Sequence, residues 1–247
     1  MSAEGLFSMR ANSLYKAIFD RSLAVLGERN QRRLARSRVV VAGLGGVGAM
    51  AAEMLARSGV GELVLIDCDT YELSNLNRQL HSGMGVLGEK KVDVVAERLK
   101  ETNPVLKIGK VAGRLDARNA GRILKGADVA IDGLDTAFDR ALLARASRKA
   151  GIPYVFGSAA GAIGMSTVFM PGSGWTYEKT FRLPKDEAGL KAYPRCDAIL
   201  GIVSNMVGLV EATQAVKLLL GWKVVAAPDI IRVDLGERSI LSVKKLD

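Results

Sequence analysis

Short apolar runs alternate with segments of helical periodicity along most of the chain. The apolar runs predict strands at 38–42, 62–66, 106–111, 129–132 and 153–156. Between the runs, apolar residues recur three or four positions apart, which predicts helices at 49–58, 88–101, 117–125 and 137–150. Strands and helices that alternate in this way predict an α/β fold, with a doubly wound, mainly parallel, Rossmann-like sheet.

The pattern changes at both ends of the chain. Residues 1–36 have apolar positions at helical spacing and predict a helical lead-in. Beyond the last predicted strand we expect another strand at 165–170 and a polar loop or lid at 175–192. A long apolar interface helix at 203–220 and a terminal hairpin of 230–233 with 239–243 should follow. No repeat or low-complexity linker interrupts the sequence, so we expect one continuous domain over 1–247.

The composition is that of an ordinary globular protein. Of the 247 residues 49% are hydrophobic and 25% are charged, and the 27 glycines indicate many turns or close backbone approaches. Only 5% are aromatic, so a base-stacking surface for single-stranded nucleic acid is poorly supplied. The net charge of +9 fits a surface for nucleic acid, an acidic protein or polyphosphate, and it equally fits a solvated basic helix face.

Membrane insertion and secretion have little support in the sequence. The N-terminal segment carries charges and no long apolar core, unlike a signal peptide. Residues 198–220 form the most apolar segment, but polar and charged residues interrupt it, which favours a buried or interface helix over a membrane span. We therefore expect a cytoplasmic protein.

A glycine-rich turn follows the first predicted strand. Gly43, Gly45 and Gly48 form the pattern Gly-x-Gly-x-x-Gly, which also contains Gly46, and a helix follows. Glycines here permit a tight turn and close approach of the backbone to a phosphate, and the helix N-terminus attracts the anion. The motif predicts a nucleotide site, but it does not distinguish a dinucleotide from ATP.

Two acidic residues follow the next strand. Asp67 lies at the carboxyl end of that strand, where a carboxylate accepts hydrogen bonds from ribose hydroxyls. Asp69 either shares this role, helps to hold a cation, or is an ordinary turn carboxylate.

Two cations and an asparagine-rich turn favour ATP over a nicotinamide nucleotide. Arg78 belongs to the turn 74–79, which also contains Asn75, and Lys91 follows at the start of the next helix. Cations directed at phosphates suit phosphoryl or nucleotidyl transfer, because the charge on the phosphate oxygens must be stabilised. Hydride transfer has no need of them.

This set of motifs resembles the E1-like adenylyltransferase family. Its members include the ThiF, MoeB and HesA proteins and the activating enzymes of ubiquitin-like modifiers. The glycine turn, the two acids, the 74–79 turn and Lys91 match the family motifs in order and spacing. The resemblance continues through 129–135 and 215–219, and it covers about residues 15–243.

The resemblance implies ATP and Mg²⁺, attack of a substrate carboxylate on the α-phosphate, and release of pyrophosphate from an acyl-adenylate. By matching position Asp67 would hold the ribose, and the phosphates would be surrounded by Asn75, Arg78 and Lys91. A substrate carboxylate is already a nucleophile, so positioning and charge neutralisation would supply most of the catalysis.

Asp135 is the candidate Mg²⁺ ligand in the resemblance, and its place in the chain agrees. It follows the carboxyl end of a strand, where the ligands of open α/β sheets collect. Mg²⁺ favours one or two carboxylates together with phosphate oxygens. Asp132 and Asp139 are nearby competitors for this role.

An N-terminal arginine of this family can reach across a dimer interface into the neighbouring ATP site. The stretch 19–22 is the best match, which makes Arg21 the candidate; the alternative is one more basic residue on a lead-in helix. The resemblance also implies a homodimer, for which the apolar 203–220 helix is an independent hint.

The cysteines differ from those of many relatives, which bind structural zinc through two Cys-x-x-Cys pairs. This chain has only Cys68 and Cys196, so we expect no zinc site. Cys196 lies roughly where sulfur-transferring relatives keep a reactive cysteine, although the segment after it is slightly shorter. Arg195 beside it would favour the thiolate, whereas a small, partly buried apolar residue is the ordinary alternative.

The function implied by the resemblance is ATP-dependent adenylylation of a carboxylate. The expected substrate is the C-terminal glycine of a ubiquitin-like sulfur-carrier protein, as in thiamine or molybdopterin biosynthesis. A small-molecule carboxylate in cofactor assembly and threonylcarbamoyl-adenosine in tRNA stay open, as do an NAD-dependent oxidoreductase and a non-catalytic nucleotide-binding module. Within the domain we expect 37–157 to bind the nucleotide and 158–247 to bind the substrate and a second subunit.

Overall fold

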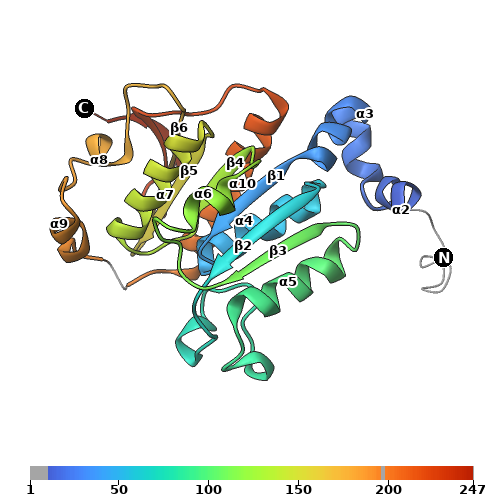
Figure 1. Cartoon of the computed structure of the whole chain (residues 1–247), viewed down its shortest axis with the longest axis horizontal. Helices are drawn as coiled ribbons and strands as arrows, with labels where there is room; N and C mark the ends of the chain where they lie inside the picture. The colour runs from blue at the N-terminus through green and yellow to red at the C-terminus, as the bar shows by residue number, and fades with distance from the viewer. Residues whose placement is uncertain (1–10, 196–197, 247) are drawn as a thin grey trace.

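The computed structural model describes residues 11–195 and 198–246, which form one sheet with helices on both faces (Figure 1). The strands are β1 (Arg38–Ala42), β2 (Glu62–Asp67), β3 (Lys107–Ala112), β4 (Val129–Asp132), β5 (Tyr154–Ala160), β6 (Ile163–Phe169), β7 (Asp229–Asp234) and β8 (Leu241–Lys245). The α-helices are α2 (Ala11–Ile18), α3 (Asp20–Arg36), α4 (Gly46–Ser58), α5 (Lys91–Thr102), α6 (Ala120–Leu124), α7 (Ala137–Ala150), α8 (Tyr177–Thr180), α9 (Glu187–Ala192) and α10 (Gly201–Leu220). Two 3₁₀ turns, η1 (Leu73–Asn75) and η2 (Met84–Val86), lie between β2 and α5.

The first five strands form the parallel part of the sheet. The strand order is β3-β2-β1-β4-β5-β6-β7-β8, and β1 pairs in parallel with both β2 and β4. Along β1, Val39 and Val41 belong to the core beneath α4, α5 and α10, whereas Val40 and Ala42 belong to the core beneath α6 and α7. A strand buried on both faces reads as a continuous apolar run, which is the pattern of 38–42. The predicted doubly wound sheet is confirmed.

The C-terminal strands extend the same sheet in antiparallel fashion. β6 pairs with β5, β7 with β6 and β8 with β7, and β7 and β8 form the predicted hairpin. By length and composition alone α10 could cross a membrane, but half of its apolar window is buried in this fold. The helix packs on α4, β5 and β6, as the sequence predicts for a buried helix.

Several segments differ from the sequence prediction, as three examples show. α4 begins at Gly46 rather than three residues later, so the glycine turn itself enters the helix. The predicted loop at 175–192 contains α8 and α9, which begin where Thr176 and Asp186 each accept a hydrogen bond from a backbone amide three residues on. The lead-in consists of α2 and α3 with a non-helical Gly27, and its residues 1–10 lie outside the described part.

Candidate active site

The site lies at the carboxyl ends of β1 and β4, the point at which the strand order reverses. The glycine turn leaves β1, and Gly133 follows β4, the adjacent strand. A β-carbon at Gly133 would lie 2.8 Å from Cα of Gly48, and one at Gly43 would lie 2.9 Å from the amide nitrogen of Leu134. Gly43 also has a positive φ of 85°. These contacts require glycine, because any side chain would force the two loops apart.

The first turn of α4 has the features of an anion site. The face of Gly45 is open, since the nearest atom to an added β-carbon would be Nε2 of Gln79 at 3.9 Å. Gln79 is 6% exposed, and its Oε1 has no hydrogen-bond partner among the described residues. The residues present therefore fit a nucleotide phosphate: amides at a helix N-terminus and a glycine that a phosphate can approach.

Asp67 is bonded to the glycine turn itself. Its Oδ2 accepts a hydrogen bond from the Leu44 amide at 2.6 Å, and its Oδ1 accepts one from the Asp69 amide at 2.7 Å. Burial raises the pKa of the Asp67 carboxyl, against the lowering effect of these two amides and of Lys91. The carboxylate is thus fixed at the edge of the turn, where the sequence predicts a ribose ligand.

Lys91 lies against the same two acids. Its side chain is 8% exposed, and Nζ lies 3.2 Å from Oδ2 of Asp69. Burial alone would raise the pKa of Asp69, but Lys91, the Cys68 thiol and Arg114 together lower it. A buried lysine at the start of α5 therefore lies across the Asp67 and Asp69 carboxyl groups from the glycine turn.

Asn75 and Arg78 hold their own turn together. The Glu72 amide donates to Oδ1 of Asn75 at 3.0 Å, which caps the 3₁₀ turn. Nη1 of Arg78 donates to the carbonyl oxygen of Ser74 at 2.6 Å, so its guanidinium is folded onto the 74–79 turn. The backbone at Arg78 lies beside Gly46, and its carbonyl oxygen accepts a hydrogen bond from Asn205 of α10. The turn is therefore at the site, and the predicted phosphate contacts stay a prediction.

Asp135 is exposed at the mouth of the β4–α7 turn. Its side chain is 74% exposed, and Oδ2 lies 3.4 Å from Nη1 of Arg195. Cys196 lies outside the described residues. Of the described residues next to it in the sequence, Arg195 pairs with Asp135. The carbonyl oxygen of Ala198 accepts a hydrogen bond from the Gly161 amide.

Asp132 is directed into the protein instead. It is fully buried, and its two oxygens accept hydrogen bonds from the Tyr154 hydroxyl at 2.5 Å and the Leu134 amide at 2.9 Å. Burial raises the pKa of Asp132 to about 6, against the lowering effect of Arg140, Tyr154 and the Leu134 amide. Of the two strand-end acids, Asp135 is the one placed to meet a solvated ligand.

This raised pKa predicts a pH dependence of stability. The folded pKa of Asp132 lies above the unfolded value, so the folded protein binds more protons and gains stability as the pH falls from 7 to 5. Denaturant unfolding should show wild type gaining about 1 kcal/mol over Asp132→Asn across this range. The charged or titratable groups that face Asp132 are Arg140, Tyr154, Glu211 and Asp135. Parallel pH profiles of the two proteins would contradict the shift.

Arg21 does not meet the glycine turn of its own chain. It is exposed on α3, which leads into the amino end of β1, whereas the glycine turn leaves the carboxyl end (Figure 1). α3 lies instead near the end of α10, where Nη1 of Arg33 donates to the carbonyl oxygen of Leu220. Arg21 could therefore reach a nucleotide only in a second copy of the chain.

Sequence reasoning missed three residues of this site. Gly133 and Gln79 contact the glycine turn, and Arg114 follows β3 and lies near Cys68, Asp69 and Asp139. Arg114 carried an available signal, because it follows a parallel strand as Asp67 does. Gln79 and Gly133 belong to the stretches 74–79 and 129–135 that match the family, but only the fold shows that they lie beside the glycine turn.

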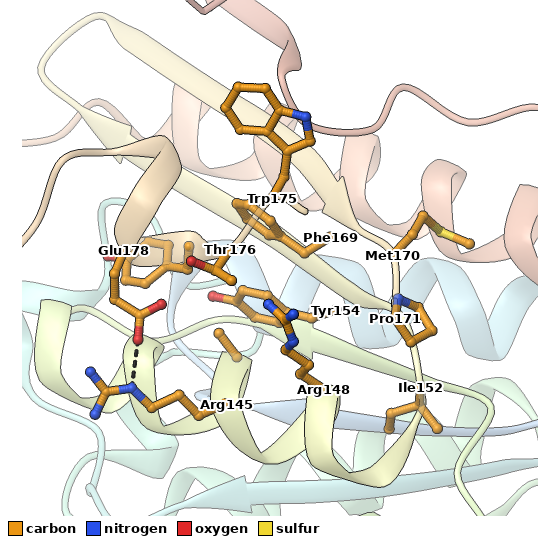
Figure 2. Close-up of a pocket in the computed structure, with 12 residues that line it drawn as sticks. Arg145, Arg148, Ile152, Tyr154, Phe169, Met170, Pro171, Trp175, Thr176 and Glu178 are labelled. Atoms are coloured by element: carbon orange, nitrogen blue, oxygen red, sulfur yellow. Dashed lines mark hydrogen bonds and ion pairs between the residues drawn. The ribbon is translucent and has the colours of Figure 1, made fainter. Parts of the chain in front are cut away.

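A small pocket lies between α7 and the 170–178 segment (Figure 2). Its volume of about 40 Å³ has room for water but not for a nucleotide. Tyr154 and Phe169 line it (Figure 2), and on one side Nε of Arg145 lies 2.5 Å from Oε1 of Glu178. Tilted and edge-on contacts between Phe156, Tyr177 and Phe181 thus hold residues 177–181 against β5.

Comparison with known proteins decides the family. The profile described as the ThiF family matches residues 19–245. The chain belongs to this family. The SAMP-activating enzyme E1 of Haloferax volcanii is 37% identical over 195 residues, which are 79% of this chain and 72% of that protein. The probable adenylyltransferase/sulfurtransferase MoeZ of Mycobacterium tuberculosis is 34% identical over 202 residues, 79% of this chain and 51% of MoeZ.

These relatives are adenylyltransferases of the E1-like type, which confirms the resemblance predicted from 39–92. The chain spans about half the length of MoeZ and of the similar MOCS3 proteins. Among solved structures, E. coli MccB matches this chain with a TM-score of 0.77 at 21% identity. The match covers 93% of this chain and 72% of MccB, which shows the ThiF-type fold. E. coli tRNA N6-threonylcarbamoyladenosine dehydratase has a TM-score of 0.70 at 26% identity over 85% of this chain and 96% of that one.

Proposed function

We propose that this ThiF-family chain uses ATP and Mg²⁺ to adenylate a carboxylate, with release of pyrophosphate. One observation carries the proposal: the glycine turn, Asp67, Lys91 and the turn bearing Asp135 converge at the switch point between β1 and β4. A relative of the same fold is described in complex with ATP. The exposed Asp135 carboxylate supplies the oxygen ligand that Mg²⁺ prefers.

In this proposal each residue has one task. Asp67 accepts hydrogen bonds from the ribose, and the first turn of α4 binds the phosphates. Lys91 and Arg78 neutralise the charge that develops on the phosphate oxygens and the departing pyrophosphate. Asp135 holds Mg²⁺, which would offset the remaining charge. The attacking carboxylate needs no base, so these residues contribute orientation and electrostatic stabilisation.

The proposed substrate is the C-terminal glycine of a ubiquitin-like sulfur-carrier protein. The SAMP-activating enzyme E1 and MoeZ, the two curated relatives above, support this class. In the same scheme the Cys196 thiol acts after adenylation, in sulfur transfer. The alternative substrate, a small-molecule carboxylate, keeps the adenylation step and changes only which carboxylate is adenylated.

The tRNA substrate is a second candidate with its own observation. This chain covers 96% of the structurally similar tRNA dehydratase, whereas it covers 51% of MoeZ. The net charge of +9 also suits a polyanion. This candidate shares the adenylation step with the first.

Exchange of labelled pyrophosphate into ATP tests the function. The assay would be run with Mg²⁺ and, in turn, a sulfur-carrier protein ending in Gly-Gly, threonylcarbamoyl-adenosine tRNA, and a set of small acids. Exchange that depends on one of these supports adenylation and names the substrate class. No exchange with any of them, in protein that still binds ATP, would defeat the proposal.

Arg21 is proposed to act in the neighbouring subunit of a homodimer. Arg21→Ala and Asp135→Asn should each lower exchange as homodimers. A mixed dimer with one change per subunit keeps one complete site, so it should recover about half of the wild-type rate. If Arg21 served its own subunit, the mixed dimer would not exceed the mean of the two mutant homodimers.

A further inference from the structure

The turn that carries Asp135 is short and Asp135 itself is exposed, so the position of the turn depends on what lies beneath it. The Gly133 amide donates to the carbonyl oxygen of Ala42 at 2.7 Å, and the Leu134 amide donates to Asp132. On the other side Thr136 caps α7 by accepting from the Asp139 amide. The Asp135 carboxylate pairs with Arg195, and both side chains are exposed.

Arg140 is the side chain that binds this turn from inside. Its Nε and Nη2 both donate to the carbonyl oxygen of Leu134, at 3.2 and 2.7 Å, and Nη1 donates to Oγ of Ser158 at 3.3 Å. Its Nε lies 3.5 Å from Asp132, and the guanidinium stacks over Phe156 at 5.5 Å. One guanidinium thus joins the turn to β4 and β5, with 15% of its side chain exposed.

The charges around Arg140 are arranged so that one carboxylate faces it. Asp132 is the hydrogen-bonded, buried acid beside it. Glu211 of α10 is buried too, and a β-carbon added at Gly157 would lie 2.5 Å from its Oε1. Burial, and then the Asp132 charge, raise the pKa of Glu211 well above its ordinary value, and neither Glu211 oxygen has a hydrogen-bond partner among the described residues. Arg140 therefore keeps its donors for the turn and for Asp132.

We propose that Arg140 is a positioning residue for Asp135: its forked bond to the Leu134 carbonyl fixes the 133–136 turn, so that the Asp135 carboxylate is held toward the nucleotide site. This inference rests on the proposed function, because it assigns Asp135 to the cation. Lysine could supply the charge at this position but not the fork, since an ammonium is a point donor on a flexible stem.

Two measurements on the nucleotide-free and ATP-bound protein test the inference. The first is hydrogen exchange of the Leu134 amide, and the second is calorimetric ATP affinity with and without saturating Mg²⁺. Arg140→Lys keeps the charge next to Asp132 and is expected to fold. The matched control is Arg145→Lys on the same helix, because Arg145 pairs with Glu178 and not with the turn.

In Arg140→Lys we expect the gain in ATP affinity from Mg²⁺ to fall by about tenfold, the usual effect of removing a partner that orients a metal ligand. Hydrogen exchange of the Leu134 amide should accelerate, because the 133–136 turn opens more often. Arg145→Lys should match wild type in both. An unchanged Mg²⁺ gain in Arg140→Lys, with Asp135→Asn abolishing it, would overturn the inference alone. No Mg²⁺ gain in wild type would overturn the Mg²⁺ part of the proposed function, and the inference with it.

Discussion

Asp135→Asn should reduce pyrophosphate exchange by on the order of 10²–10³-fold, with the fold unchanged. Asparagine keeps the size of the side chain and removes the charge that would hold Mg²⁺. The carboxylate is 74% exposed and its partner Arg195 is also exposed, so little stability depends on it. The loss should appear in the rate of exchange and in its Mg²⁺ requirement, and thermal unfolding should stay close to wild type.

Asp229→Asn is the matched control for this change. Asp229 is an exposed strand-end acid on β7, which pairs with β6 and β8 rather than with β1 or β4. The Asp229→Asn protein should exchange pyrophosphate at the wild-type rate. If Asp135→Asn also kept the wild-type rate, the cation would have to be held elsewhere, and Asp67 with Asp69 would be the next pair to change.

Gly48→Ala should destabilise the protein by on the order of 3 kcal/mol and abolish ATP binding. The added methyl group would overlap the carbonyl oxygen of Gly43 and lie 3.1 Å from Cα of Gly133. Backbone atoms cannot move aside as a flexible side chain can. Relief would require α4 to shift away from the β1 and β4 loops, which separates the groups that meet at the site. Denaturant unfolding and ATP titration measure the two effects.

Gly121→Ala provides the control in another helix. Gly121 lies in α6, and an added β-carbon there would have no atom within 4 Å. Alanine is a better helix former than glycine, so stability should stay unchanged or rise by up to about 1 kcal/mol. Equal effects of the two substitutions would mean that the close approach at Gly48 is readily relaxed.

Much of the site was predictable because it follows from strand order. Gly43 and Asp135 follow parallel strands and Asp67 ends one, and the carboxyl ends of parallel strands meet at one edge. Lys91 was predictable from its motif, and the structure places it against Asp69.

Other parts of the site depend on contacts that no local pattern reports. Arg140 and Arg145 are both arginines of α7, yet one binds the Asp135 turn and the other pairs with Glu178. Arg140 lies on the buried face of α7 with Ala137 and Ala141, but hydrophobic periodicity does not report which group a charged residue on that face binds. α8 and α9 are too short for periodicity to detect, although their capping residues were visible in the sequence.

The close packing of α10 limits how this protein can adapt to a substrate. A β-carbon on Gly208 would lie 2.9 Å from Cβ of Met50 in α4, and the same helix packs on β5 and β6. One rigid helix therefore spans the parallel and antiparallel parts of the sheet, and a hinge between them would have to break its contacts. Tolerance for different acceptors must come from the loops above the strand ends, so exchanging residues 170–195 between relatives is the route to altered specificity.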